Sequence, residues 1–157
     1  MAETSESWLQ VAGVPLPERL SLRCVDAANM GDLAESRIRD GYTQREIDAG
    51  VRMLDCIEVI EQWQPVNPRS VALRMCLHIG WRDDPGTDHF HLYLVTNDLR
   101  SHIYSNRIAS FIFVDEFVWP KVLASFLNTI RMCDRTTWEA SVEELRKRFD
   151  WEYEGMP

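Results

Sequence analysis

Residues 136–154 of this chain read TTWEASVEELRKRFDWEYE. Four apolar residues recur in this stretch at the spacing that places side chains along one stripe of a helix: Trp138, Val142, Leu145 and Phe149. Thr136 stands where an N-cap belongs and Glu139 follows three residues later, which is the pattern of a capping box. The stretch therefore predicts an amphipathic helix whose apolar stripe needs a surface to pack on.

The polar face of this predicted helix carries opposite charges four residues apart. Glu143 precedes Lys147 and Glu144 precedes Arg148, in the order that favours a helix. Beyond the helix, residues 151–154 alternate aromatic and acidic side chains, as a short extended segment does. We expect the aromatic residue Trp151 to join the core that the stripe forms, because aromatic side chains bury a large apolar area.

A second helix is predicted just upstream. Pro120 suits a first helical turn, where a missing N–H costs nothing. The apolar residues that follow define one buried stripe: Val122, Leu123, Phe126, Leu127 and Ile130. Residues 133–135 close this helix and lead directly into the capping pattern of the next one.

Strand patterns occupy the middle of the chain. Residues 71–81 alternate apolar and polar side chains, residues 83–88 have turn chemistry, and residues 89–94 alternate again, which predicts a β-hairpin with one face on a core. Residues 111–114, FIFV, are apolar on both sides and predict a strand that is either covered on both faces or central in the sheet. Residues 55–61 alternate less clearly and predict a mixed first strand.

Strands followed by two helices indicate an α+β fold. We expect an antiparallel sheet of three or four strands, with the two C-terminal helices packed on one face. Residues 53–157 are the predicted domain. Residues 1–52 contain turn residues and no sustained alternation, so we expect a weakly structured or partly helical extension, with one short helix after a capping box at Thr43 and Glu46. Because Met53 directly precedes a strand, a native start there is a further hypothesis.

Composition excludes several classes of protein. A net charge of −8 argues against a nucleic-acid partner, which would require a basic patch. No window approaches the roughly 18 apolar residues of a membrane span, and the acidic N-terminus is unlike a signal peptide, so we expect a cytoplasmic protein. The four cysteines form no CxxC pair, and dispersed cysteines of this kind are usually small buried apolar residues.

Three histidines form the pattern most like a catalytic site. His89 and His91 share a strand face, and His78 would join them if the hairpin pairs residue 78 with residue 91. Three imidazoles near Asp88 could ligate zinc, which makes a small metal-dependent enzyme the alternative interpretation. The competing explanation is a polar sheet face. No nucleophile elbow, phosphate loop or metal-binding helix motif is present, so we expect neither an enzyme nor a cofactor.

Residues 55–154 as a whole resemble a known family. The strand ending FHLYLVTNDL, the strand FIFVDEF, the helix KVLASFLNTIRMC and the C-terminal TTWEASVEELRKRFDWEYE are similar to the immunity protein 8 family of bacterial polymorphic toxin systems. Family members often carry a Pro after the Thr at the hairpin's exit, where this chain has Asn97. The resemblance implies a non-enzymatic protein that binds and neutralises a cognate protein toxin, encoded by a neighbouring gene.

Exposed carboxylates are the candidate partner-binding groups. Acidic side chains attract a basic cleft on a partner and increase the rate of association. We expect them in the hairpin turn, before the first C-terminal helix and in the C-terminal tail: Asp83, Asp84, Asp88, Asp115, Glu116, Glu152 and Glu154.

Overall fold

The computed structural model describes residues 2–29, 38–39, 55–104 and 111–153. The chain forms two compact units. Unit 1 comprises Met1–Val25, Cys76–His91 and Val118–Pro157. Unit 2 comprises Asp26–Met75 and Leu92–Phe117. The helix expected after Thr43 and the acid Glu154 lie outside the described residues.

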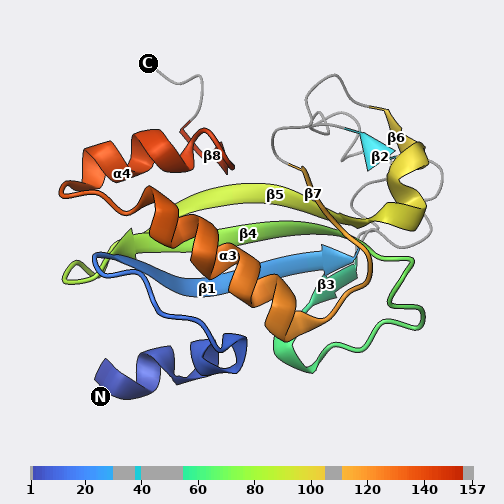
Figure 1. Ribbon diagram of the computed structural model, residues 1–157, viewed down its shortest axis with the longest axis horizontal. Helices are drawn as coiled ribbons and strands as arrows, with labels where there is room; N and C mark the ends of the chain where they lie inside the picture. Colours follow the sequence, from blue (N-terminus) through green and yellow to red (C-terminus); the bar gives the residue numbers. More distant parts are fainter. Residues whose placement is uncertain (1, 30–37, 40–54, 105–110, 154–157) are drawn as a thin grey trace. The chain divides into compact units, whose positions relative to one another are not determined.

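Eight strands, three 3₁₀ helices and two α-helices follow one another along the described residues (Figure 1). In chain order they are η1 (Ala2–Ala12), β1 (Leu20–Asn29), β2 (Ile38–Arg39), β3 (Asp55–Ile57), η3 (Ile60–Gln62), β4 (Ala72–Trp81), β5 (Asp88–Thr96), η4 (Asn97–His102), β6 (Ile103–Tyr104), β7 (Phe111–Val114), α3 (Trp119–Cys133), α4 (Trp138–Leu145) and β8 (Asp150–Trp151). The predicted α+β class is confirmed.

The sheet is larger than predicted. It has six strands, in the order β3-β1-β4-β5-β7 with β8 also paired to β5, whereas the sequence indicated three or four. β1 pairs antiparallel with β3, and β8 pairs antiparallel with β5, but β7 runs parallel to β5. β2 and β6 form a separate parallel pair. Residues of β1, β4 and β5 belong to both units.

The longest strand that the sequence patterns did not predict is β1, which lies within residues 1–52. Its first three residues, Leu20, Ser21 and Leu22, are all buried, and from Arg23 to Ala27 exposed positions alternate with half-buried or buried ones. The apolar residues of the sequence change phase at Val25, so no sustained two-residue periodicity marks the strand, although it lies between β3 and β4 in the sheet. Residues 1–52 thus contain a sheet strand as well as η1.

Within unit 2, β7 is the last strand in the sheet order, so of the two predicted possibilities the central strand is wrong. The Phe111 ring stacks on Tyr93 at a centroid distance of 5.0 Å, and the Arg100 guanidinium lies 4.1 Å from the centroid of Phe113. Aromatic stacking and an arginine cover this apolar strand at the sheet's edge, where the sequence suggested a second sheet neighbour. The unit's core cluster is Ala72, Tyr93, Val95, Leu99 and Phe111.

Within unit 1, α3 agrees closely with the prediction. Pro120 lies in its first turn and the helix ends at Cys133. All five residues of the predicted stripe are buried, and Trp119 and Cys133 are buried with them. α3 contacts both η1 and α4, and α3 and α4 lie on one face of the sheet, as expected (Figure 1).

α4 begins and ends at slightly different residues from those predicted. The N-cap is Thr137, whose side-chain oxygen accepts from the Ala140 N–H at 3.1 Å; Thr136 does not cap it. The helix ends at Leu145, so its ion pairs span three residues and not four: Glu143 with Arg146 at 2.9 Å, and Glu144 with Lys147 at 2.8 Å. Because Lys147 and Arg148 lie past the helix end, the i,i+4 geometry is not available to them.

The four cysteines differ in burial. Cys133 is buried, and burial raises the pKa of its thiol. Cys76 is half-buried, whereas Cys24 and Cys56 are exposed, so the expectation of buried cysteines is wrong for these two. None of the four described cysteines forms a disulfide bond.

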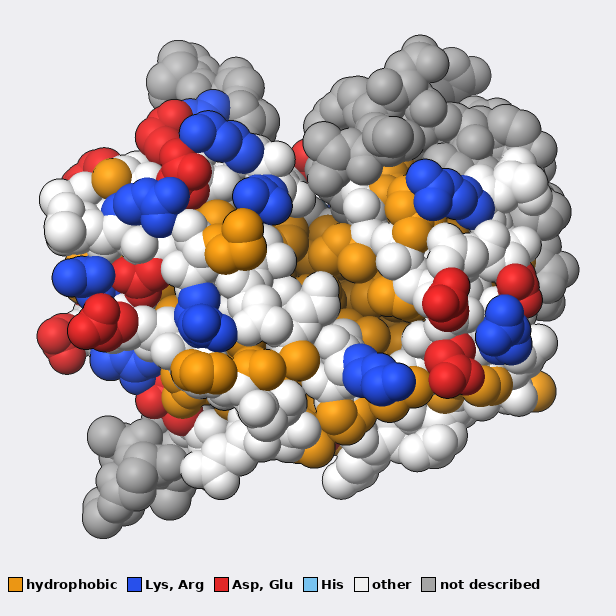
Figure 2. All heavy atoms as spheres, in the orientation of Figure 1, with side chains coloured by type: hydrophobic (Ala, Val, Ile, Leu, Met, Phe, Trp, Pro, Cys, Tyr) orange, Lys and Arg blue, Asp and Glu red, His pale blue; other side chains and the backbone are white. Residues whose placement is uncertain are grey.

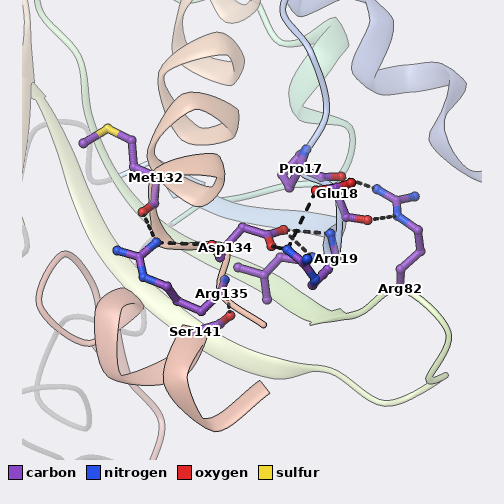
Figure 3. Close-up of polar contacts among 9 residues, drawn as sticks. Pro17, Glu18, Arg19, Arg82, Met132, Asp134, Arg135 and Ser141 are labelled. Atoms are coloured by element: carbon purple, nitrogen blue, oxygen red, sulfur yellow. Dashed lines mark hydrogen bonds and ion pairs between the residues drawn. The ribbon is translucent and has the colours of Figure 1, made fainter. Parts of the chain in front are cut away.

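The segment between α3 and α4 is fastened to the start of β1 by one carboxylate (Figure 3). Asp134 Oδ2 accepts from the backbone N–H groups of Arg19 and Leu20, at 2.7 and 2.9 Å, and Oδ1 accepts from the Arg19 guanidinium at 3.2 Å. Arg82 donates to the carbonyl oxygens of Pro17 and Glu18 beside this joint.

We predict that Asp134→Ala lowers the free energy of unfolding by about 2 kcal/mol, the usual range for hydrogen bonds to a charged group. The substitution removes the acceptor of two backbone N–H groups, and the Asp134 side chain is only 7% exposed. Urea unfolding of the full chain measures the loss. A change below about 0.5 kcal/mol, the level of an ordinary surface substitution, would contradict this role.

The same contact predicts a pH dependence. Burial alone would raise the pKa of Asp134, but the N–H groups of Leu20 and Arg19 and the Arg19 guanidinium outweigh it, and the pKa is lowered. A carboxyl with a lowered pKa in the folded state stabilises fully above its unfolded pKa of about 3.9 and loses this contribution as the pH falls through the folded value. Stability should therefore fall less steeply with acid in Asp134→Asn than in the parent chain.

Deletion of residues 1–52 tests the predicted domain division. A chain starting at Met53 lacks β1, so β3 loses its partner, and Asp134 loses its donors from Arg19 and Leu20. We expect this chain to unfold at a temperature at least about 10 °C lower, since a 1 kcal/mol loss shifts the midpoint by about 2–8 °C and several such contacts vanish. Calorimetry of both chains provides the comparison.

Candidate functional site

The end of unit 1 at which β4 turns into β5 is held by an arginine from β1. Arg23 donates from its guanidinium to the carbonyl oxygens of Trp81 and Asp84, at 2.6 and 2.7 Å. Its Nε donates to the hydroxyl of buried Ser21 at 2.9 Å. Within the turn, Asp84 Oδ1 accepts from the Gly86 N–H at 2.8 Å. These contacts fix the path of residues 81–86 by hydrogen bonds to the backbone itself.

A close approach between two glycines also shapes this turn. A Cβ atom at Gly80 would collide with the Gly86 carbonyl oxygen and would touch the Thr87 methyl group at 3.2 Å. Gly80 is therefore required by the space available, because only a residue without a side chain lets the turn fold back on the strand.

A pocket of about 410 Å³ opens beside the turn. Its lining combines two tryptophans with three carboxylates and the turn backbone: Trp81, Asp84, Gly86, Thr87, Asp88, Trp138 and Glu139. The Trp81 and Trp138 rings are half-buried and meet edge to face, with centroids 6.4 Å apart at 78°. The pocket therefore has aromatic walls and an acidic rim.

The start of α4 supplies one side of this pocket. Ser141 Oγ accepts from the Arg135 N–H at 2.8 Å (Figure 3). The Thr137 side chain caps the helix, so two hydroxyl groups fix the first turn of α4. Trp138 and Glu139 are the first two helical residues. An acidic side chain in the first turn is favourable beside the positive end of the helix dipole.

β8 pairs with the part of β5 that follows the pocket residue Asp88. The Trp151 indole donates to Asp88 Oδ2 at 3.0 Å, and Phe90 is the paired residue of Trp151 in the sheet. Glu152 accepts from the His89 N–H at 2.8 Å while its own N–H donates to the His89 carbonyl at 3.0 Å. The C-terminal aromatic and acidic segment is thus tied to β5 through side chains as well as backbone.

The acidic residues on α4 are mostly neutralised by their neighbours. Glu144 pairs with Lys147 and lies 3.4 Å from Arg135, and the hydrogen bond from Lys147 lowers the pKa of Glu144. Figure 2 shows blue and red side chains interspersed where α4 lies, at the upper left. By contrast, no ion pair within the described part of the chain involves Asp83, Asp84 or Glu139.

The predicted partner-binding acids occupy different environments. Asp83 and Asp84 are exposed in the hairpin turn, and Asp88 is half-buried against Trp151. Glu152 is half-buried against His89. In unit 2, Asp115 and Glu116 are exposed, and Asp115 Oδ1 accepts from the Asn97 amide at 2.7 Å. Their contact with a partner stays a prediction.

Among the predicted core residues, Val142, Leu145 and Phe149 are 5%, 0% and 2% exposed. Trp138 and Trp151 are half-buried. Both indoles therefore keep part of their surface in solvent, and that of Trp138 faces the pocket.

The histidines only partly come together. The His78 and His89 rings lie with centroids 4.2 Å apart, tilted by 49°. His91 does not join them in a metal-ligating set in the part of the chain that the structure describes. His89 Nδ1 lies 3.8 Å from a Glu152 oxygen. This arrangement gives no support to the three-histidine metal site of the alternative interpretation.

Four pocket residues were not identified as site residues from the sequence: Trp81, Gly86, Thr87 and Glu139. Trp81 was taken as the last apolar residue of an alternating strand, and Glu139 as a capping residue. The available signal was a bulky aromatic at the strand exit, immediately followed by the acidic turn Asp83-Asp84-Pro85-Gly86, since such a side chain extends beyond the core that the strand covers.

The fold and the site define a small α+β protein whose hairpin end presents two indole rings and several carboxylates to solvent. The model of the immunity protein 8 family matches residues 49–156, so the chain belongs to that family. No curated protein and no solved structure matches this sequence. Within the described residues, none of the helices has the length and apolarity that crossing a bilayer requires.

We predict that Gly80→Ala destabilises the protein by about 1–3 kcal/mol, as overpacking does. The added methyl group meets the backbone oxygen of Gly86 and not a flexible side-chain end, so the turn itself must move. Gly86→Ala is the matched control, because a Cβ there meets only the Asp84 carboxylate, at 3.2 Å. Thermal unfolding of both variants measures the difference, and equal midpoints would contradict the steric argument.

Proposed function

We propose that this protein is an immunity protein that binds a cognate bacterial toxin and neutralises it by occlusion in the cytoplasm of the cell. The observation that supports this most directly is membership of the immunity protein 8 family over residues 49–156. The family is typically non-enzymatic, and binding alone suffices for an antidote. The partner is a protein toxin encoded by a neighbouring gene.

The charge distribution supports an electrostatic contribution to binding. The chain carries a net charge of −8, and Asp83 and Glu116 are exposed without an ion pair among the described residues. Free carboxylates of this kind act over about 8–10 Å at ordinary ionic strength and attract a basic surface. They accelerate encounter with a toxin and select a partner of opposite charge more than they strengthen the final complex.

Co-expression with the toxin domain of the neighbouring gene tests the function itself. Cells that produce the toxin should survive only when the full-length chain is also produced, and the purified proteins should form a stoichiometric complex. Survival without complex formation would contradict occlusion, and killing despite production of both proteins would contradict the immunity function.

Kinetics test the electrostatic contribution. We predict that the association rate falls at least about tenfold between low and high salt. Asp83→Asn/Glu116→Gln should lower the association rate at low salt with little change in dissociation. The control Glu58→Gln/Glu61→Gln also removes two exposed charges, at residues that no prediction assigns to the partner. Rates independent of salt, or equal effects of the two double variants, would exclude steering by the predicted acids.

A further inference from the structure

We propose that the pocket between Trp81 and Trp138 accepts one arginine side chain of the toxin. This inference rests on the proposed function and gives the toxin surface a chemical requirement: a protruding arginine. It begins from the pocket lining, in which Asp84, Asp88 and Glu139 surround the two indoles. No described lysine or arginine lines the pocket.

Aromatic walls and carboxylates together select a cation that is also flat. A guanidinium stacks on an indole face and donates N–H groups in a fixed fork to a carboxylate, whereas an ammonium offers a compact and strongly hydrated charge. The edge-to-face arrangement of Trp81 and Trp138, at 78°, presents the face of one ring beside the edge of the other. A side chain with an apolar stem and a planar charged end suits such walls.

The same chemistry already occurs once in this unit. The Arg146 guanidinium lies 5.0 Å from the centroid of the Trp151 ring, and Trp151 donates to Asp88, which also lines the pocket. An arginine of this chain thus lies over the neighbouring Trp151 indole. No arginine is among the residues that line the pocket of Trp81 and Trp138.

The pocket is also held ready for a ligand. Arg23 fixes the turn through the carbonyl oxygens of Trp81 and Asp84, and Thr137 caps the helix that carries Trp138 and Glu139. Its volume of about 410 Å³ lies in the ordinary range for small ligand sites, roughly 300–1,000 Å³. Less ordering is then needed on binding, which preserves affinity.

The three carboxylates of the pocket differ in how many hydrogen bonds they already accept. Asp84 uses Oδ1 for the Gly86 N–H, and Asp88 uses Oδ2 for the Trp151 indole. Glu139 is exposed and makes no hydrogen bond or ion pair among the described residues. Glu139 is therefore the residue that we assign to the guanidinium, with Asp84 and Asp88 adding negative charge.

The experiment uses the full chain and a single arginine as its probe. Nα-acetyl-L-arginine methylamide is added to ¹⁵N-labelled protein, and the indole N–H signals of Trp81 and Trp138 are followed by NMR. We expect saturable shifts of both signals with a dissociation constant on the order of millimolar. The citrulline methylamide, neutral and of similar shape, should bind at least about tenfold more weakly, because it lacks the charge.

Charge-removing variants locate the binding. Glu139→Gln should weaken the arginine probe about threefold, the usual effect of one exposed ion pair, while Glu143→Gln, which removes an acid elsewhere on α4, should leave it unchanged. Asp84→Asn and Asp83→Asn form a second matched pair in the turn, of which only Asp84 lines the pocket. All four residues are exposed, so the folded state should survive each change.

Several results would overturn the inference. If the citrulline probe binds as tightly as the arginine probe, the pocket does not require a positive charge. If lysine methylamide binds as tightly, the pocket does not require a guanidinium group. Shifts confined to the other four tryptophans would place the probe elsewhere.

In the toxin complex, Glu139→Gln should raise the dissociation rate, because a docked contact is lost. If the protein neutralises its toxin but binds no arginine probe, the arginine pocket is contradicted and the proposed function is not. If it binds the probe but protects no cell, the proposed function is contradicted and the arginine pocket is not.

Discussion

The carboxylate of Asp134 is the contact on which the geometry of unit 1 depends. It follows α3 directly and accepts from two consecutive backbone N–H groups at the start of β1, so one side chain fixes the end of a helix against the start of a strand 114 residues away in sequence. Backbone N–H groups at a strand start cost free energy if they are buried without an acceptor. The ionised carboxylate satisfies two of them together, which a neutral side chain with one acceptor oxygen does less well.

Fixing that joint also determines where α4 starts. Arg135 follows Asp134 immediately, and its N–H donates to Ser141, so the segment between the helices has little freedom left. The first helical residue, Trp138, is thereby brought against Trp81 at the end of β4. A contact between β1 and the end of α3 consequently determines the distance between two aromatic rings that come from α4 and β4.

Local patterns in the sequence predicted the elements whose burial has a simple period. α3, most of β4 and the first part of β5 have one covered face each, and their apolar residues recur at 3.6 or 2 residues accordingly, whereas both faces of β5 are buried from Leu92 to Thr96. β1 escaped prediction because its apolar residues change phase: Leu20, Leu22 and Cys24 occupy every second position, but Val25 and Ala27 fall on the other set. β7 is the last strand of the sheet order, where its Phe113 packs against the core cluster with the Arg100 guanidinium over its ring, and a strand's composition does not reveal what covers it.

The candidate site was predicted only in part, because its residues serve the core and the surface at once. Trp138 lies on the same helical stripe as buried Val142 and Leu145, yet it is the first residue of α4, and no preceding turn of that helix covers its ring. The position of a residue within an element therefore matters as much as its periodicity. Trp81 is the equivalent case on β4: it continues the buried face of the strand past the point at which the core ends.

Hydrogen bonds fix the backbone around these two rings. The partial exposure of the rings is therefore a stable feature and does not come from loose packing. Gly80 allows the turn to approach β4, and Arg23 holds the turn through its carbonyl oxygens. Burial of indole surface stabilises a folded protein. Two rings that a fixed turn keeps half-exposed therefore contribute less to stability than buried rings would. Sites that forgo stability in this way are commonly places where another molecule supplies the missing contact, and carboxylates around such rings favour a contact of positive charge.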